Sequence, residues 1–482
     1  MTADPGSTGS DAAVRIRPAP LPAGRGRASA LTNGRPPHSL QTLGRDMTQT
    51  AAPTGTDHAQ TESAAGASLD RLRAEHTALA SRGLRLNIAR GKPSPAQLDL
   101  SNALLGALDP ADCKTAAGDD VRNYGGDPRG LAELRAVFGP LMGAKPEQVV
   151  AGGNSSLAMM HDCLVWALLK GVPGSREPWS AVPRPAFLCP APGYEKHHLM
   201  CEEFGIELLA VPVTPDGPDM DTVERLVADP RVKGMWCVPT YANPTGETYG
   251  ARTVRRLADM AAGASDFRIF WDDAYVVHHL RGHAASKAEI IDLCAAAGNP
   301  DRPFVFASTS KITFGGGGVG FFAGSPRNVE WYLARDSRRG VGPDKINQLR
   351  HACFLRDVDN LGSHMDAHGA LLAPKFDAVQ SALQGRLHGH NVATWSVPRG
   401  GYFVSIETKP GIARRAVELA QEAGVTLTVA GSTWPYGRDP NDSNIRIAPS
   451  FATLEEVEAA AEVIALSILL AAAEQARGAG GA

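Results

Sequence analysis

The feature that most constrains the fold is an alternation of short apolar segments with longer amphipathic segments, running from Leu69 to about residue 345. The short segments are bounded by Pro or Gly and have the length of buried strands, whereas the longer ones repeat apolar residues at helical spacing. This order predicts an α/β fold with a mostly parallel sheet covered by helices on both faces. The expected strands are Gln148–Ala151, Ala186–Cys189, Glu207–Pro212, Lys233–Val238, Arg268–Trp271 and Phe304–Ala307. The expected helices are Ser155–Leu169, Lys196–Phe204, Met220–Ala228 and Ala251–Ala262.

The last hundred residues have a different pattern, which predicts a smaller α+β domain. Its final helix should begin at a capping box formed by Thr453 and Glu456. The other expected elements are a long helix over Ala370–Leu387, strands at Trp395–Val397 and Tyr402–Ile406, a helix at Ile412–Glu422 and a strand at Ile445–Ala448.

Charge and composition exclude several classes of protein. The 482 residues carry a net charge of −3, so there is no excess of basic residues for binding a nucleic-acid backbone. The apolar run from Val463 to Ala473 is far shorter than the roughly 20 residues of a membrane span. The seven cysteines are scattered and form no CxxC pair, so we expect reduced thiols, no metal site and a cytoplasmic location.

Residues 1–66 are rich in Ala, Gly, Pro, Ser and Thr and contain no Lys. Such a segment buries too little apolar surface to offset its chain entropy, so we expect a disordered extension. Six arginines before residue 46 are a feature of transit peptides, but the many prolines and glycines argue against the amphipathic helix that a transit peptide needs. Met47 can be the natural start of the chain.

The most informative segment is Ser308-Thr-Ser-Lys311, which directly follows an expected strand and leads into a run of glycines. Ligands of parallel sheets bind at the carboxyl ends of the strands. Burial lowers the pKa of an ammonium group and makes its amine nucleophilic, so Lys311 is a candidate for bonding to an aldehyde. On its own, the segment is more often that of an ordinary phosphate-binding or surface lysine.

Three other strand ends carry polar residues. Asp272 and Tyr275 follow one strand, and Asn243 follows another within Asn-Pro-Thr-Gly. The segment Gly152–Ser156 joins a strand to a helix and can cradle a phosphate with its N–H groups and hydroxyls. Each has a simpler reading, as a helix cap for Asp272 or an ordinary turn for the other two.

Taken in this order, the four segments resemble the class I aminotransferases, which are fold-type I enzymes dependent on pyridoxal 5′-phosphate. The resemblance covers roughly residues 70 to 475 and implies a large cofactor-binding domain and a small domain built from both chain ends. Four further motifs resemble the divergent bacterial aspartate aminotransferase subgroup, often called type Ic. They are Ala89-Arg-Gly-Lys-Pro-Ser94, Asn123-Tyr-Gly-Gly-Asp-Pro-Arg-Gly130, Gly342-Pro-Asp-Lys-Ile-Asn-Gln-Leu-Arg350 and Asn441-Asp-Ser-Asn-Ile-Arg-Ile-Ala-Pro449. The domain bounds that we expect are 1–66 for the extension, 67–115 and 346–475 for the small domain, 116–345 for the large domain and 476–482 for a flexible tail.

The resemblance also implies a role for each site residue. Lys311, Asp272 and Tyr275 would be catalytic: Lys311 bonds to the cofactor, Asp272 pairs with its pyridine nitrogen, and Tyr275 with Asn243 binds its phenolic oxygen. Arg446 would hold the α-carboxylate of the substrate, since a planar fork suits a carboxylate. The remaining cofactor contacts would come from Asn154, Ser155, Ser156, Tyr194, Ser308 and Ser310, and from Tyr124 of the neighbouring subunit in a homodimer; the remaining substrate contacts would come from Arg90, Gly91 and Asn243.

Two positions depart from the common pattern of the family. Val319 stands where an arginine usually meets the phosphate, and Ala191 stands where an aromatic residue usually stacks on the cofactor ring. Tyr194 can take over the stacking. The sequence also leaves open which cation meets the second carboxylate of aspartate, a charge that is costly to bury unpaired. The candidates are Arg90, Lys92, Arg338, Arg339 and Lys345.

We therefore expect an aspartate:2-oxoglutarate aminotransferase that acts on amino acids and 2-oxo acids by a ping-pong mechanism, with no nucleic acid and no membrane as partner. The alternatives are an aminotransferase of aromatic, alanine or kynurenine specificity, a β-lyase, or a regulator with an aminotransferase-like domain. A regulator of that kind needs a basic DNA-binding head of about 60 residues, and the first 66 residues are too rich in Pro and Gly to form one.

Overall fold

The computed structural model describes residues 55–282 and 289–480, and its larger sheet has eight strands. In spatial order the strands are β2 (Val149–Ala151), β9 (Gly320–Ala323), β8 (Pro303–Ser308), β7 (Arg268–Asp272), β6 (Val232–Cys237), β3 (Ala186–Ala191), β4 (Glu207–Thr214) and β5 (Gly217–Pro218). The five strands from β8 to β4 are parallel, whereas β9 and β5 are antiparallel to their neighbours. The mostly parallel α/β sheet is confirmed, as are its six expected strands.

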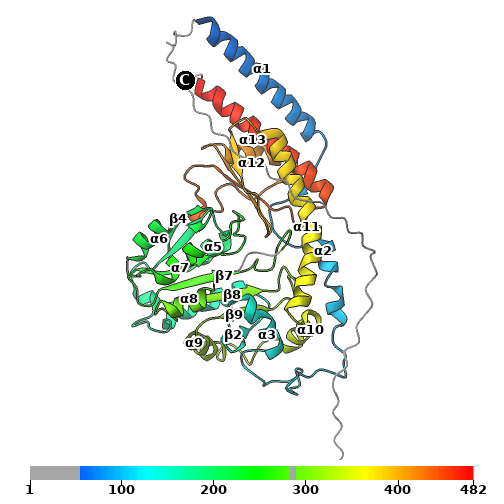
Figure 1. Ribbon diagram of the computed structural model, residues 1–482. Coiled ribbons are helices and arrows are strands. Elements are labelled where there is room, and N and C mark those ends of the chain that lie inside the picture. Colours follow the sequence, from blue (N-terminus) through cyan, green and yellow to red (C-terminus); the bar gives the residue numbers. More distant parts are fainter. Residues whose placement is uncertain (1–54, 283–288, 481–482) are drawn as a thin grey trace, which may run out of the picture. The chain divides into compact units, whose positions relative to one another are not determined.

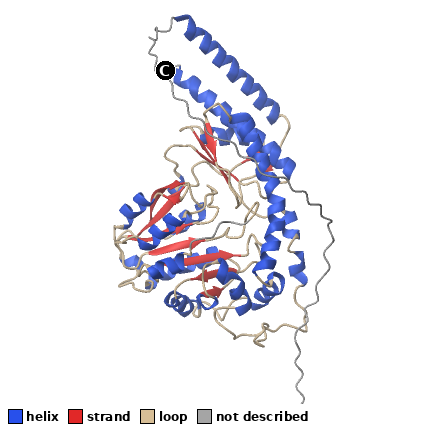
Figure 2. Cartoon of the chain, viewed as in Figure 1, coloured by secondary structure: helices blue, strands red, loops and turns tan. Residues whose placement is uncertain are grey.

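The side chains of each central strand alternate between two apolar cores, one on either face of the sheet. In β7, Ile269 and Trp271 belong to one core and Phe270 to the other. Both faces are buried because helices cover them, and these helices lie on either side of the strands (Figures 1 and 2). The covering helices are α3 (Ala132–Leu141), α4 (Ser156–Lys170), α5 (Glu195–Glu203), α6 (Met220–Val227), α7 (Ala251–Asp259), α8 (Ile290–Ala296), α9 (Pro326–Asp336) and α10 (Lys345–Leu355).

A second group of elements joins segments from both ends of the described chain. β1 (Leu86–Asn87) pairs in parallel with β12 (Val425–Thr426), and β10 (Ala393–Trp395), β11 (Val404–Thr408) and β13 (Asn444–Ile447) form an antiparallel sheet in that order. Its apolar core includes residues of α1 (Gly55–Ala80), α11 (Val358–Leu387), α12 (Ala413–Glu422) and α13 (Leu454–Gly480). The short helix α2 (Pro95–Asp99) completes the set. The division at residues 116, 346 and 476 stays a prediction, and residues 1–54 lie outside the described part.

Two helices show where the sequence pattern succeeds and where it fails. The capping box is confirmed, since Thr453 N donates to Glu456 Oε2 at 2.8 Å and Glu456 N to Thr453 Oγ1 at 3.2 Å. The expected start of α11 at residue 370 is wrong, because the helix begins after Asp357, whose carboxylate accepts from Asn360 N at 2.8 Å. Within the described residues, none of the helices combines the length and apolar character that crossing a membrane requires.

Candidate active site

A pocket lies at the carboxyl ends of β6, β7 and β8, beside the first turn of α4. Nine of the residues expected to contact the cofactor line this pocket, although they are spread over more than 150 positions of the sequence. They are Ser155, Ser156, Tyr194, Asn243, Asp272, Tyr275, Ser308, Ser310 and Lys311. The parallel strands bring these side chains together because their carboxyl ends share one edge of the sheet.

Lys311 follows the end of β8, and its Nζ lies 4.8 Å from the centre of the Tyr275 ring. Burial lowers the pKa of this amine, with the charge of Asp272 opposing the change. Two side chains fix the Lys311 carbonyl: it lies 3.3 Å from His278 Nε2 and accepts from Tyr402 Oη at 3.4 Å. Lys311 is thus an amine with a lowered pKa on a backbone that is fixed by side chains of other elements.

Asp272 is the last residue of β7 and is only 4% exposed. Its Oδ2 lies 3.1 Å from His197 Nε2, whereas its Oδ1 has no hydrogen-bond partner in the part of the chain that the structure describes. His197 in turn stacks on Trp236, with ring centres 4.2 Å apart. The sequence analysis missed His197, which lies in α5 and carries no motif that marks it. A buried carboxylate oxygen without a partner is costly unless a cation or a donor meets it.

The first turn of α4 forms the polar end of the pocket. Ser155 is its N-cap and accepts from Ala158 N at 3.2 Å, and Ser156 follows it. A Cβ on Gly320 would lie 2.9 Å from Ser156 N, so only glycine permits this approach of the two backbones. The N–H groups and hydroxyls at this helix start suit a phosphate. Asn154 is exposed on the preceding loop and does not line the pocket.

Arg446 lies in β13 and is 4% exposed. Its Nη1 donates to Asn243 Oδ1 at 3.1 Å, which places the guanidinium group next to the pocket. A Cβ on Gly91 would lie 2.5 Å from the Phe403 ring, and that ring lies under the Arg446 guanidinium at 5.0 Å. Arg90, by contrast, is exposed. Glu195, which the sequence analysis did not consider, pairs with Arg446 at 2.5 Å.

Other expected residues lie away from the pocket. Tyr124 is 80% exposed, on a segment where Lys345 Nζ donates to Gly125 O at 2.5 Å. Lys92 lies over the Phe451 ring at 3.7 Å, and Arg339 pairs with Asp162 at 3.1 Å. Neither these cations nor Arg90 and Arg338 line the pocket, so none is singled out as the partner of a second carboxylate.

The two departures from the family pattern have a structural setting. Val319 is 1% exposed, and its N–H donates to Thr309 Oγ1 at 2.9 Å, so this position is part of the apolar core. Ala191 is 2% exposed at the end of β3, while Tyr194 lines the pocket. Lys311 is the one cation among the described residues that line the pocket, so the backbone and hydroxyl groups at α4 are the donors available to an anion there.

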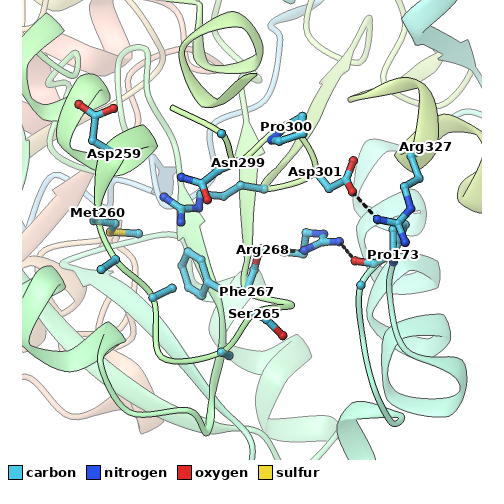
Figure 3. Close-up of a pocket in the computed structure, with 16 residues that line it drawn as sticks. Pro173, Asp259, Met260, Ser265, Phe267, Arg268, Asn299, Pro300, Asp301 and Arg327 are labelled. Carbon is cyan, nitrogen blue, oxygen red and sulfur yellow. Dashed lines mark hydrogen bonds and ion pairs between the residues drawn. The ribbon is translucent and has the colours of Figure 1, made fainter. Parts of the chain in front are cut away.

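A larger pocket, of about 430 Å³, lies at the amino ends of the parallel strands, around the first residue of β7. Figure 3 shows Arg268 bonded to the Pro173 carbonyl and Arg327 paired with Asp301, at 3.0 Å. Its lining residues include no lysine, histidine or cysteine. The smaller pocket, which holds Lys311 and Asp272, is therefore the candidate active site.

Comparison with known proteins identifies the family. The family model described as aspartate amino-transferase matches residues 60–479. The chain belongs to this family. It is 51% identical over 399 residues to a putative aminotransferase of Mycolicibacterium smegmatis, and the matched segment covers 82% of this chain and 93% of the relative. It is 47% identical over 396 residues to the aspartate aminotransferase of Corynebacterium glutamicum, covering 82% of this chain and 91% of the relative.

Solved structures agree with the family. The crystal structure of an aspartate transaminase from Corynebacterium glutamicum superposes with a TM-score of 0.84 at 45% identity, covering 86% of this chain and 97% of the other. A putative aminotransferase from Corynebacterium diphtheriae gives 0.82 at 47% identity, covering 84% and 100%. The expected class I aminotransferase fold is confirmed, and so is a pyridoxal phosphate-dependent aminotransferase that acts on amino acids and 2-oxo acids.

The pocket itself fits this cofactor. Asp272 Oδ1, which has no partner among the described residues, can accept a hydrogen bond from a protonated pyridine nitrogen, and this removes the cost of leaving a buried carboxylate oxygen without a donor. The helix start at Ser155 and Ser156 supplies donors for a phosphate, and Lys311 supplies an amine for an aldehyde. These three groups face the same pocket.

Proposed function

We propose that the protein transfers the amino group of L-aspartate to 2-oxoglutarate, giving oxaloacetate and L-glutamate. The observation that carries the choice of aspartate is the 47% identity, over 396 residues, to the aspartate aminotransferase of Corynebacterium glutamicum. An aminotransferase of aromatic, alanine or kynurenine specificity is the alternative that the same pocket allows.

Bound pyridoxal phosphate supplies an aldehyde carbon that takes up the amino group and a ring that accepts electrons when the substrate Cα loses its proton. Lys311 would hold that aldehyde through its Nζ, and as a free amine it would move a proton between the substrate Cα and the cofactor C4′. Its lowered pKa favours the neutral amine that this proton transfer needs. Asp272 Oδ1 would accept from the pyridine nitrogen and keep it protonated, while His197 Nε2, 3.1 Å from Oδ2, holds the Asp272 carboxylate in place.

Hydroxyl and amide groups fix the orientation of the cofactor. Tyr275 and Asn243 would donate to its phenolic oxygen. Burial raises the pKa of Tyr275 well above its usual value, which keeps its phenol a donor. The start of α4 would hold the phosphate. We assign its contacts to Ser155, Ser156, Ser308 and Ser310, with Asn154 beside them.

The substrate is held from the small sheet. Arg446 binds the α-carboxylate bidentately, with Asn243 fixing the same guanidinium group. The backbone directly before Arg90 and Gly91 is tied to Arg446, because Thr428 Oγ1 accepts from Arg446 Nε at 3.2 Å and donates to Ala89 O at 2.8 Å. We assign the remaining substrate contacts to Arg90 and Gly91 on this basis. Without a side chain at residue 91, the Phe403 ring can pack beneath Arg446.

We propose a homodimer whose active sites are shared. Tyr124 and Val341 are 80% and 78% exposed, and Lys345 ties their two segments together through Gly125. A large aromatic side chain exposed to this extent suits a contact with a second copy. Tyr124 would there reach the phosphate bound by the neighbouring subunit. We place the dimer in the cytoplasm, where the seven thiols, all free of disulfides, remain reduced.

Steady-state kinetics test the proposal, with aspartate, alanine, phenylalanine and kynurenine as donors to 2-oxoglutarate and with glutamate as donor to oxaloacetate. With 2-oxoglutarate as acceptor, kcat/KM should be largest for aspartate. Arg446→Lys should raise KM for every donor in the panel, by roughly tenfold or more, because the α-carboxylate is common to all of them. A higher kcat/KM for an aromatic donor, or a KM change confined to dicarboxylates, would contradict the proposal.

A further inference from the structure

The side chain of Glu195 lies against the end of the Arg446 fork. Its Oε2 lies 2.5 Å from Nη1 and its Oε1 lies 3.0 Å from Nη2, so the contact is bidentate. This is the geometry with which an arginine binds the carboxylate of a ligand. Glu195 is the first residue of α5, whereas Arg446 lies 251 positions later in β13. The contact therefore exists only because of the fold.

The remaining donors of Arg446 are also engaged. Nε donates to Thr428 Oγ1 at 3.2 Å, and Nη1 donates to Asn243 Oδ1 at 3.1 Å. Nη2 donates to Thr428 Oγ1 at 3.1 Å and reaches Ala89 O at 3.5 Å. A guanidinium group has five N–H donors. The protein itself thus occupies all of them, and a carboxylate can reach the fork only by displacing one of the present partners.

Glu195 is the partner that can leave. Its side chain is 26% exposed against 4% for Arg446, and in the part of the chain that the structure describes its carboxylate contacts no cation other than Arg446. Burial raises the pKa of Glu195, but hydrogen bonds from Arg446 outweigh that effect and lower it overall. Near neutral pH it is therefore a carboxylate, as the substrate group is.

We propose that Glu195 is an internal competitor that occupies the α-carboxylate position of Arg446 and exchanges with the α-carboxylate of each substrate. The inference rests on the role proposed above for Arg446. During the exchange one carboxylate leaves and another enters, so the buried guanidinium group always keeps a bidentate partner, and losing that partner would be costly.

The exchange affects every anionic ligand of the fork. Any anion that binds the fork must displace the same Glu195 contact, so Glu195 should weaken every such ligand by a similar factor, regardless of the rest of the ligand. A substrate carboxylate replaces that contact with another bidentate one, whereas chloride offers one point of contact and stays the weaker ligand.

The test compares Glu195→Gln with the wild-type holoenzyme, and uses Glu203→Gln, an exposed glutamate of the same helix, as the matched control. In Glu195→Gln, KM for aspartate and for glutamate should both fall by roughly tenfold, as should the Kd of succinate, a dicarboxylate that does not react. Inhibition by chloride should become stronger. Glu203→Gln should match the wild type in all of these measurements. Unchanged or higher values in Glu195→Gln would overturn the exchange and make Glu195 a fixed partner of Arg446.

Glu195→Asp provides a second variant if the amide variant does not fold. Its carboxylate is one methylene shorter, so its contact with the fork is weaker, and KM and the succinate Kd should fall by a smaller factor in the same direction. No change here would overturn the proposal as well. A failure of the exchange is distinguishable from a failure of the proposed function: the former leaves the aspartate activity of the wild type and the KM increase of Arg446→Lys intact, whereas the latter removes one or both.

Discussion

Two lysine–aspartate pairs lie at opposite ends of the parallel strands in the eight-stranded sheet. We call the side where these strands begin the amino edge and the side where they end the carboxyl edge. Lys233 and Asp266 lie near the amino ends of β6 and β7, whereas Lys311 and Asp272 lie at the carboxyl ends of β8 and β7. Asp266 and Asp272 are 5% and 4% exposed, so both carboxylates are equally buried. The two pairs therefore differ in their partners rather than in their depth.

At the amino edge every charged atom has a partner. Asp266 Oδ1 accepts from Lys233 Nζ at 2.8 Å, and Oδ2 accepts from Ser175 at 2.7 Å and from Trp179 at 3.0 Å. At the carboxyl edge, Asp272 Oδ1 and Lys311 Nζ have no hydrogen bond within residues 55–282 and 289–480. A complete set of partners stabilises the fold, whereas an incomplete set leaves groups ready for a ligand.

Replacing each of the two lysines separately should give the largest contrast in activity between the two edges. Lys311→Ala removes the amine that bonds to the cofactor and carries the proton, so kcat should fall by about 10⁴-fold or more. Lys233→Met removes the partner of Asp266 and should lower stability while leaving kcat of the folded holoenzyme unchanged. Borohydride reduction followed by peptide mapping should find the pyridoxyl group on Lys311 in the wild type and in Lys233→Met. A fully active Lys311→Ala would remove the distinction between the edges.

Neutralising the aspartates should give the next largest contrast. Asp272→Asn can no longer keep the pyridine nitrogen protonated, so the rate of the chemical step should fall by about 10³-fold, which corresponds to roughly 4 kcal/mol of barrier. Asp266→Asn should leave that rate unchanged. Stopped-flow absorbance in a single half-reaction measures the step directly. Equal losses in the two variants would show that burial alone, rather than the missing partner, determines the effect.

Much of the carboxyl edge could be predicted from sequence. Asn243, Asp272, Tyr275 and Lys311 each follow a recognisable buried strand, and parallel strands bring such positions together at one edge. The strand β9 was missed because it begins at Gly320, directly after a run of glycines that resembles a loop. The first three turns of α11 were missed because polar residues dominate them, even though Leu361 and Met365 are buried at helical spacing.

The partners of the predicted residues could not be found in this way. His197 and Glu195 belong to a short helix whose sequence has no motif, and their contacts with Asp272 and Arg446 span 75 and 251 positions. Such contacts depend on how α5 packs across the strand ends. The fully partnered Asp266 is equally invisible in the sequence, because nothing local distinguishes it from Asp272.

The two aspartate variants should rank in the opposite order for stability and for activity: Asp266→Asn should be the more active and the less stable of the two. Asp266→Asn leaves Lys233 buried with a weaker partner and should lower the free energy of unfolding by about 3 kcal/mol. Asp272→Asn removes a charge from an oxygen that has no donor, so the stability of the cofactor-free protein should be unchanged or higher. Urea unfolding followed by tryptophan fluorescence measures both. A destabilised Asp272→Asn would mean that its contact with His197 is as structural as the Lys233–Asp266 pair.

Acid should weaken the carboxyl edge before the amino edge. His368 is 1% exposed and contacts Gln97 at 3.1 Å and His364 at 3.2 Å. Gln97 donates to Tyr402 Oη at 3.0 Å, and Tyr402 Oη donates to the Lys311 carbonyl at 3.4 Å. Burial, with the neighbouring His364, lowers the pKa of His368 to about 4. A depressed histidine pKa contributes stability above the unfolded value of about 6.5, and this contribution is lost as pH falls from there toward 4.

Asp266 keeps its contribution to stability throughout that pH window. Burial raises its pKa, but hydrogen bonds led by Lys233 outweigh the effect and lower it below 3.8, so its contribution is lost only under more acidic conditions. The urea midpoint should therefore fall between pH 6.5 and 4 in the wild type, by the equivalent of roughly 3 kcal/mol from His368. In His368→Gln, which cannot titrate, the fall should be smaller, and in Asp266→Asn the slope should match the wild type. An unchanged slope in His368→Gln would assign the acid sensitivity to other groups and leave the two edges equally tolerant of acid.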